Sequence, residues 1–411
     1  MKKILNLTIL IFLFSKCSSN NTDEITKDVC SSNTNSSTEE SFYIENQIDL
    51  ENFSTLGYTK INNTLSISKS DDLSSLKCLE YIKTLRLNQN TFENLNGLDR
   101  IKEIETLHII GCNNLKTLNG LNNLENVSEI IIENNSSLQN FTGLNKVKKI
   151  NHLTLEYNSK IQNFEGLESL KSISSLNIYE NNNLRNFEGL YSLKRNHTND
   201  NFGSKSNRFY IAQNNNLESL SGLDNIYGNL HSSLFITQCP KLTSLGNFDN
   251  IINTSDIYIS FCKSLKAFDG FYDTMQIKSL VISYCESIEY INAPKIFRIG
   301  YLNIGDNPNL NSLKGLKTLN SIYSSSGDFS LQLENNPKLK TLEGFENLSY
   351  VEKIVDINIF SRNDLENTCA LSLLIKNNLY NGTTSKINIQ SKCGGYGYLI
   401  MRFNEICNCN K

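Results

Sequence analysis

The sequence lacks the features that mark several large functional classes. Its formal net charge is −3, charged residues make up 20% of the chain, and lysine and arginine form no long stripe, so we expect no nucleic-acid partner. The four histidines lie in different parts of the chain, without the spacing of a catalytic triad or a metal site. Nucleophile-elbow, phosphate-loop and metalloprotease motifs are missing too. These absences argue against an enzyme, and we expect no cofactor and no bound metal.

The chain also has few long apolar runs. A basic start at residues 1–3 precedes an apolar segment from Ile4 to Phe14, which is too short to span a bilayer comfortably and is typical of a secretion signal. Further along, no segment is long and apolar enough for a transmembrane helix, and the last residues offer no hydrophobic tail for a GPI anchor. The sequence therefore predicts an exported protein with a signal peptide at residues 1–16.

A repeated phrase runs through most of the chain. The phrase reads Leu-x-x-(Leu/Phe)-x-Gly-Leu, with Ile161 at its first position in one copy. The basic interval from one glycine to the next is 23 residues, in the range of roughly 20–29 residues that leucine-rich repeats use. The interval lengthens to 33 residues between Gly189 and Gly222, where we expect a polar surface loop over residues 195–205. A second insert is expected at residues 324–327. The glycines spaced 23 residues apart are Gly97, Gly120, Gly143, Gly166 and Gly189.

A second phrase, apolar-x-apolar-x-x-(Asn/Cys), recurs between the glycines. Leu107, Ile109 and Cys112 form one example. Alternation with a period of two and a β-branched bias predict a short strand with one buried face. Because one coil of this length cannot enclose a core, each coil must pack against those above and below it. The sequence predicts a mainly β fold, a parallel β-solenoid over residues 46–362 with about eleven coils of about 23 residues each and little α-helix.

The Asn/Cys position of this phrase is expected to point inward, where its polar group ties the turn to neighbouring backbone. A thiol can do this weakly while it packs as a small hydrophobe. Because three of the cysteines stack in adjacent coils, a metal site is conceivable, but the repeat already explains them and no histidine shares the position. The predicted structural ladder consists of Cys112, Asn135, Asn158, Asn181, Asn214, Cys239, Cys262, Cys285, Asn307 and Asn336.

Aromatic residues form a row on the expected outer face of the strands. Tyr210, Phe235 and Tyr258 fall in successive coils, and Tyr179, Phe261 and Tyr284 lie next to them. Exposed aromatic clusters mark protein or sugar binding, because a ring offers a large contact area at a low entropic cost. The alternative is that aromatics suit exposed strands through cross-strand pairing alone. The ligand-binding candidates are Tyr179, Tyr210, Phe235, Tyr258 and Tyr284.

Both ends of the chain depart from the repeat. Residues 17–45 are rich in polar and acidic side chains and hold too little apolar surface to fold, so we expect a disordered tether. Residues 363–411 are expected to form a C-terminal cap, because an open solenoid end would expose its core. The sequence leaves the roles of Cys30 and Cys78 open; a disulfide between them would seal the N-terminal end.

The C-terminal cap contains cysteines that are expected to form disulfides in an exported protein. Our preferred pairing joins Cys369 to Cys407 or Cys409, with Cys393 taking the other. Four cysteines allow three connectivities, and the sequence does not choose among them.

The repeats resemble those of the leucine-rich, receptor L-domain-like lipoproteins of Bacteroidota, on units such as residues 307–316 and 336–345 and over roughly residues 60–362. The resemblance implies a right-handed β-solenoid with a cysteine-containing C-terminal cap and, by analogy with receptor L domains, a binding module. The segment from Leu13 to Cys17 is similar to the lipobox of bacterial lipoproteins, which implies lipidation of Cys17. The polar, acidic residues that follow it resemble those associated with display on the outer leaflet.

These expectations combine in one hypothesis. The protein is expected to be anchored by lipid in the outer membrane, at the cell surface, and to bind a protein or glycan through the stacked strands. The alternative is a structural or adhesive surface protein without a discrete ligand. The identity of the ligand, and whether the anchor faces the periplasm or the exterior, stay open.

Overall fold

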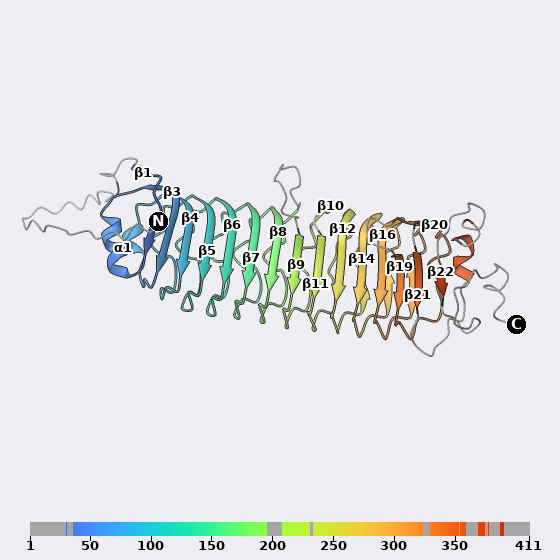
Figure 1. The fold of residues 1–411 in the computed structure, drawn as a ribbon. Helices are drawn as coiled ribbons and strands as arrows, with labels where there is room; N and C mark the ends of the chain where they lie inside the picture. Colours follow the sequence, from blue (N-terminus) through green and yellow to red (C-terminus); the bar gives the residue numbers. More distant parts are fainter. Residues whose placement is uncertain are drawn as a thin grey trace, which may run out of the picture.

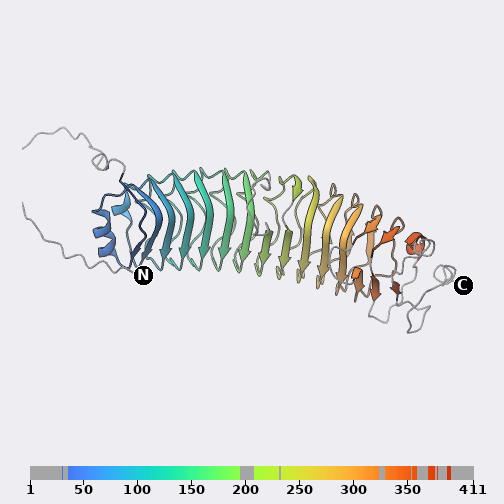
Figure 2. The ribbon, with the colours of Figure 1, turned by 45° about the horizontal axis from the view of Figure 1, so that its top comes forward.

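The computed structural model describes residues 30, 36–194, 208–230, 233–323, 329–352, 354–358, 369–374, 377 and 387–389. Figure 1 shows a long stack of coils along one axis, with α1 (Gln47–Ser54) at one end and β22 (Ile387–Ile389) at the other. The strands of successive coils lie side by side along the whole stack, as the second view also shows (Figure 2). The protein is a parallel β-solenoid of leucine-rich repeats, as predicted.

One parallel sheet runs the length of the stack. Each strand pairs in parallel with the strand of the next coil. Leu107 lies opposite Ile130, which in turn lies opposite Leu153, so the predicted vertical stacking of the repeats is confirmed. The strands, in the order in which they pair, are β3 (Lys60–Ser68), β4 (Tyr81–Asn88), β5 (Glu103–Ile110), β6 (Asn126–Glu133), β7 (Lys149–Glu156), β8 (Ser172–Tyr179), β9 (Arg208–Ala212), β11 (Ser233–Thr237), β12 (Ile251–Ser260), β14 (Gln276–Ser283), β16 (Arg298–Gly305), β19 (Phe329–Glu334), β21 (Ile354–Asn358) and β22.

Shorter strands complete the described architecture. Three of them, β10 (Gly228–Leu230), β18 (Ser321–Ile322) and β20 (Tyr350–Val351), extend the main sheet at the edge where its strands begin. Another three, β13 (Ala267–Phe268), β15 (Tyr290–Asn292) and β17 (Ser312–Gly315), pair into a separate parallel sheet. The sequence predicted one strand per coil, so it missed this second sheet. The short 3₁₀ turns η2 (Ser74–Leu76) and η3 (Cys369–Leu371) lie near the two ends.

The core lies inside the coils and consists of aligned apolar columns. Apolar side chains, mostly leucine and isoleucine, are buried at the alternating strand positions from β3 to β19. A further column holds phenylalanines, where the ring centroids of Phe141 and Phe164 are 5.5 Å apart and those of Phe164 and Phe187 are 5.1 Å apart. Each buried leucine or phenylalanine contributes about 1.5–3 kcal/mol relative to an exposed one. The repeat therefore stabilises itself only when coils are stacked in register.

The repeated glycine allows close approach between coils. Gly166 has a φ of +100°, and a Cβ atom there would lie 2.3 Å from the carbonyl carbon of Phe141 in the preceding coil. Only glycine fits such a turn. Gly111 differs, because its φ of +65° is tolerated by asparagine and a Cβ atom would come no closer than 3.4 Å to the side chain of Gln89.

The folded region begins earlier than predicted. Strands β1 (Ser37–Thr38) and β2 (Phe42–Ile44) fall inside the segment that we expected to be tether, and both pair in parallel with β3. The solenoid therefore starts before residue 46, because Phe42 packs its ring against Phe53 and Tyr58 rather than lying in solvent.

Helix α1 covers the first coil. Asn46 begins it as the N-cap, where its side-chain oxygen accepts a hydrogen bond from the backbone N–H of Asp49 at 2.9 Å. Leu50 is buried, and so is the Phe53 side chain. The Cys30–Cys78 disulfide that would seal this end is present.

Several predicted features lie outside the described residues. They include Cys17 and the signal peptide, the loop at 195–205, the insert at 324–327, and Cys393, Cys407 and Cys409. Cys369 begins η3, but its expected partners belong to the residues left out, so the cap disulfides stay a prediction. Among the described residues, no helix has the length and apolar character needed to cross a bilayer.

Candidate functional site

Asparagine side chains join neighbouring coils from inside the turn that follows each strand. The Oδ1 atom of Asn158 accepts a hydrogen bond from the backbone N–H of Asn135 at 3.0 Å. Its Nδ2 atom donates to the carbonyls of Ile132, at 2.9 Å, and Glu156, at 2.8 Å. One side chain thus satisfies three backbone groups, and two of these hydrogen bonds are buried.

All predicted ladder residues are fully buried. The ladder also reaches further toward the N-terminus than the sequence analysis stated. Asn90 accepts a hydrogen bond from the backbone N–H of Ser70 and donates to the carbonyl of Ile67. Asn90 is the last position of the same strand phrase, after Leu85 and Leu87, so the repeat carried the signal for it.

The cysteines of the ladder keep a weaker version of this bonding. Cys262 donates its S–H to the carbonyl of Ser260 with 3.5 Å between sulfur and oxygen. Burial raises the pKa of the Cys239 thiol to about 12. Hydrogen bonding to Cys285 raises the pKa of Cys262, and the same bond lowers the pKa of Cys285. The Cys239 and Cys262 thiols therefore stay protonated. Within the described part of the chain, no three or more His, Cys, Asp and Glu side chains gather in a way that could hold a metal ion.

The residue just before each ladder member adopts a left-handed backbone conformation. Tyr157, Phe261 and Tyr284 have φ values of 57°, 54° and 55°, which are uncommon for bulky side chains. The conformation lets the chain turn away from the strand. The backbone N–H of this residue still donates to a carbonyl of the next coil; that of Phe261, for example, donates to the carbonyl of Ser283 at 3.1 Å. Because this position recurs in every repeat, its side chains form an outward column, which we call the left-handed column. Its members are Lys69, Gln89, Gly111, Asn134, Tyr157, Glu180, Gln213, Gln238, Phe261, Tyr284, Asp306 and Asn335.

Two aromatic columns meet near the ends of β9, β11, β12 and β14, and we call them together the aromatic patch: Tyr210, Phe235, Tyr258, Phe261 and Tyr284. The first three lie directly opposite one another in the strand register. The rings of Phe235 and Tyr258 stack with centroids 5.9 Å apart. In the left-handed column, the rings of Phe261 and Tyr284 lie parallel with centroids 4.6 Å apart. Tyr258, Phe261 and Tyr284 are exposed, and the other two are half-buried.

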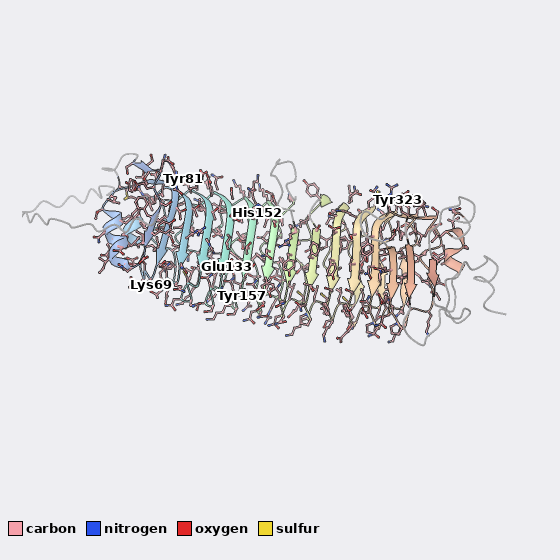
Figure 3. All side chains as sticks on the ribbon, in the orientation of Figure 1. Lys69, Tyr81, Glu133, His152, Tyr157 and Tyr323 are labelled. Atoms are coloured by element: carbon pink, nitrogen blue, oxygen red, sulfur yellow. A yellow bond between two sulfur atoms is a disulfide. The ribbon has the colours of Figure 1, made fainter. Side chains whose placement is uncertain are left out.

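Tyr179 does not join this patch, although the sequence analysis grouped it there. In the strand register it lies opposite Ala212, and its ring meets Tyr157 edge-on at 5.4 Å. Its hydroxyl donates to Gln213 at 3.1 Å, and the neighbouring Glu180 raises its pKa to about 12. Tyr157 is exposed in the left-handed column (Figure 3). Tyr157 was not among the predicted residues, although Phe261 and Tyr284, which occupy the same position in later coils, were.

Charged groups flank the patch. Arg208 places its guanidinium 5.1 Å from the centre of the Tyr210 ring, which holds that ring in place. Hydrogen bonding to Asp306 raises the pKa of Tyr284, so its hydroxyl remains a hydrogen-bond donor. The patch therefore offers apolar ring surface together with phenol groups that can donate hydrogen bonds.

A shallow hollow lies elsewhere, over the beginnings of β5, β6 and β7. It has a volume of about 560 Å³, and both acidic and basic side chains line it, among them Glu105, Glu125, Lys146 and Lys148. Such mixed charge suits a solvated surface as well as a ligand. We therefore base the functional argument on the aromatic patch.

Comparison of the sequence with protein-family models gave no match, and comparison with curated proteins gave none. Among solved structures, the chain is similar to an internalin of Listeria monocytogenes, with 14% identity, 80% of this chain and 86% of that chain covered, and a TM-score of 0.34. It is also similar to a leucine-rich repeat protein of Leptospira interrogans, with 14% identity, coverage of 90% and 100%, and a TM-score of 0.28. TM-scores this low carry no argument about the fold, which follows from the strand register and turns of this chain itself.

Proposed function

We propose that the protein is a binding module that holds a ligand against the aromatic patch. The observation that carries the proposal is the exposure of rings from successive coils at one place on a rigid solenoid. Elsewhere the left-handed column bears mostly polar side chains, so the fold itself does not require rings there. Rings fixed by stacking lose little entropy when a ligand covers them.

The geometry of the rings favours a protein ligand over a glycan. Sugars pack their C–H groups against exposed ring faces, but stacking covers one face of Phe261 and one face of Tyr284. The stacked rings instead present their edges and hydroxyl groups. Ring edges carry partial positive charge and suit carbonyl oxygens or the faces of other aromatic side chains, which polypeptides supply.

The proposal includes export and anchoring at the cell surface through a lipid on Cys17. It rests on the segment Leu13 to Cys17 and on the polar residues that follow it. Mass spectrometry of the N-terminal peptide would detect a lipidated Cys17. Protease treatment of intact cells would then distinguish exterior display, in which the chain is cleaved, from a periplasmic orientation, in which it is protected.

The binding proposal is tested with the triple variant Tyr210→Ser, Phe235→Ser, Tyr258→Ser. We expect it to lose capture of a saturable ligand from extracts of host or neighbouring cells, while its circular dichroism stays unchanged. The matched control is Tyr43→Ser with Tyr191→Ser, two exposed tyrosines outside the patch, which should bind normally. Equal capture by the triple variant would exclude this face. If no saturable partner is captured by the unaltered chain, the alternative of a structural or adhesive protein gains support.

A further inference from the structure

A second apolar surface lies at the opposite edge of the same coils. Tyr227, Ile252, Met275 and Phe297 each stand at or just before the start of a strand, and we call them the apolar ridge. Their exposed fractions are 51%, 45%, 50% and 49%. The edge on which strands begin also carries Tyr81 and Tyr323, which Figure 3 labels on the side opposite Tyr157 and Lys69.

Backbone hydrogen bonds show that the ridge is one column of adjacent coils. Met275 donates its N–H to the carbonyl of Ile252 at 2.8 Å, and Phe297 donates to that of Met275 at 2.9 Å. Tyr227 lies in the preceding coil, directly before β10, whose pairing with β12 shifts register between Gly228 and Asn229. Three large apolar side chains thus follow one another in register, and Tyr227 extends the row by one coil.

The same column is charged in the preceding coils. Tyr227 donates its N–H to the carbonyl of Lys194, which in turn donates to that of Lys171, and Lys171 donates to that of Lys148. All three lysines are exposed. The repeat does not dictate the side chain at this position, because the position holds lysine in three coils and large apolar residues in the next four.

Basic groups also border the other end of the ridge. Arg298 follows Phe297 directly, and its guanidinium lies 4.7 Å from the centre of the Tyr323 ring. Tyr323 in turn contacts Tyr350, with ring centroids 4.9 Å apart. The acidic residue Asp273, near Met275, is already paired with Lys295. The column itself continues after Phe297 with Asn320, so the ridge has lysines at one end and Asn320 at the other, with Arg298 and Tyr323 beside that second end.

We propose that the apolar ridge inserts into the headgroup region of a lipid bilayer that contains anionic lipids. Apolar and aromatic side chains with basic neighbours are the combination that binds such an interface. A single-file ridge protrudes, and a bilayer accepts a protrusion without a matching pocket. Two copies of the chain packed ridge to ridge about a twofold axis would bring Lys194 toward Arg298, so like charges disfavour self-association.

Insertion at the ridge would also orient the aromatic patch. Met275 precedes β14 and Tyr284 follows it, so the two surfaces lie at opposite ends of the same strand. Eight residues of β14 span roughly 26 Å at about 3.3 Å per residue. A bilayer at the ridge therefore leaves the patch facing away from the lipid. The inference stands independently of the proposed ligand.

Vesicle binding by the full chain carrying Cys17→Ser, which removes any attached lipid, tests the proposal. We expect sedimentation with vesicles of phosphatidylcholine and phosphatidylglycerol, and weaker binding to phosphatidylcholine alone. Met275→Ser with Phe297→Ser should lower the partition coefficient about tenfold or more. Phe261→Ser with Tyr284→Ser removes equally exposed rings from the patch, at 43% and 47%, and should leave vesicle binding unchanged while it weakens ligand capture.

Fluorescence gives a second, independent readout. The chain contains no tryptophan, so Phe297→Trp introduces a single reporter. Its emission should shift to the blue on vesicle addition and be quenched by brominated lipids, whereas a reporter at Phe261→Trp should show neither effect. Equal vesicle binding by the Met275→Ser, Phe297→Ser chain would overturn the proposal. An unquenched reporter at position 297 would overturn it too. So would a dimer, detected by sedimentation velocity, that dissociates when the ridge residues are substituted.

Discussion

Asparagine and cysteine occupy the same buried position in this solenoid, but they satisfy different numbers of backbone groups. Asn158 forms strong hydrogen bonds to Asn135, Ile132 and Glu156, whereas Cys262 donates one long bond to Ser260. We expect Asn158→Ala to lower the free energy of unfolding by about 3 kcal/mol, because it leaves buried groups unpaired, and Cys262→Ala by about 1 kcal/mol. Urea unfolding followed by circular dichroism measures both, and equal costs would contradict this view of the ladder.

The glycines also differ from one another at the scale of single residues. Gly166→Ala would place a Cβ atom 2.3 Å from backbone of the preceding coil, so we expect a loss of at least about 4 kcal/mol or a chain that does not fold. Gly111→Asn should change stability by less than about 1 kcal/mol, since Asn134 holds the same conformation one coil later at a φ of 56°. Thermal unfolding of the two variants side by side checks the contrast, and similar melting temperatures would refute it.

At the scale of elements, the N-terminal end is held by a helix and a disulfide rather than by another coil. The Cys30–Cys78 bond closes a loop with a sequence separation of 48. We expect Cys78→Ser to lower the free energy of unfolding by about 4 kcal/mol through the entropy of the unfolded chain. Hydrogen exchange measures where the effect falls, and we expect faster exchange in β3 and β4 but not in β14, because coils contact only their neighbours. Uniform loss of protection along the sheet would show that the stack is more cooperative than this.

The sequence predicted the strand that recurs in every coil and missed the elements that occur once or in only a few coils. Alternating Leu107 and Ile109 identified a strand because the same alternation recurs in each coil. Helix α1 occurs once, so no periodicity marked it, and Phe53 was not recognised as a core residue. The apolar ridge was missed for a related reason: Met275 and Phe297 lie just before strands, where the alternation of buried and exposed positions gives no information on exposure. Stacking between Phe261 and Tyr284 depends on a left-handed turn that only the structure shows.

At the scale of the whole molecule, the solenoid should behave as a sum of coils. Residues 136–181 comprise two complete repeats, because Asn135 and Asn181 are equivalent ladder positions and β7 and β8 lie between them. Removing them joins Asn135 to Asn182 and keeps every column in register. We expect a folded chain that is shorter by roughly 10 Å, since strands lie about 4.8 Å apart.

Small-angle scattering measures that shortening, and ligand capture by the shortened chain measures whether the aromatic patch acts locally. We expect capture to persist, because the deletion ends one coil before Tyr210 and leaves the strands from β9 onward paired as before. The matched control removes residues 136–170. This deletion is one and a half repeats long, so it brings buried positions of one coil opposite exposed positions of the next. That chain should fail to fold. If both deletions fold equally well, the stacking of coils in register is not what specifies this structure.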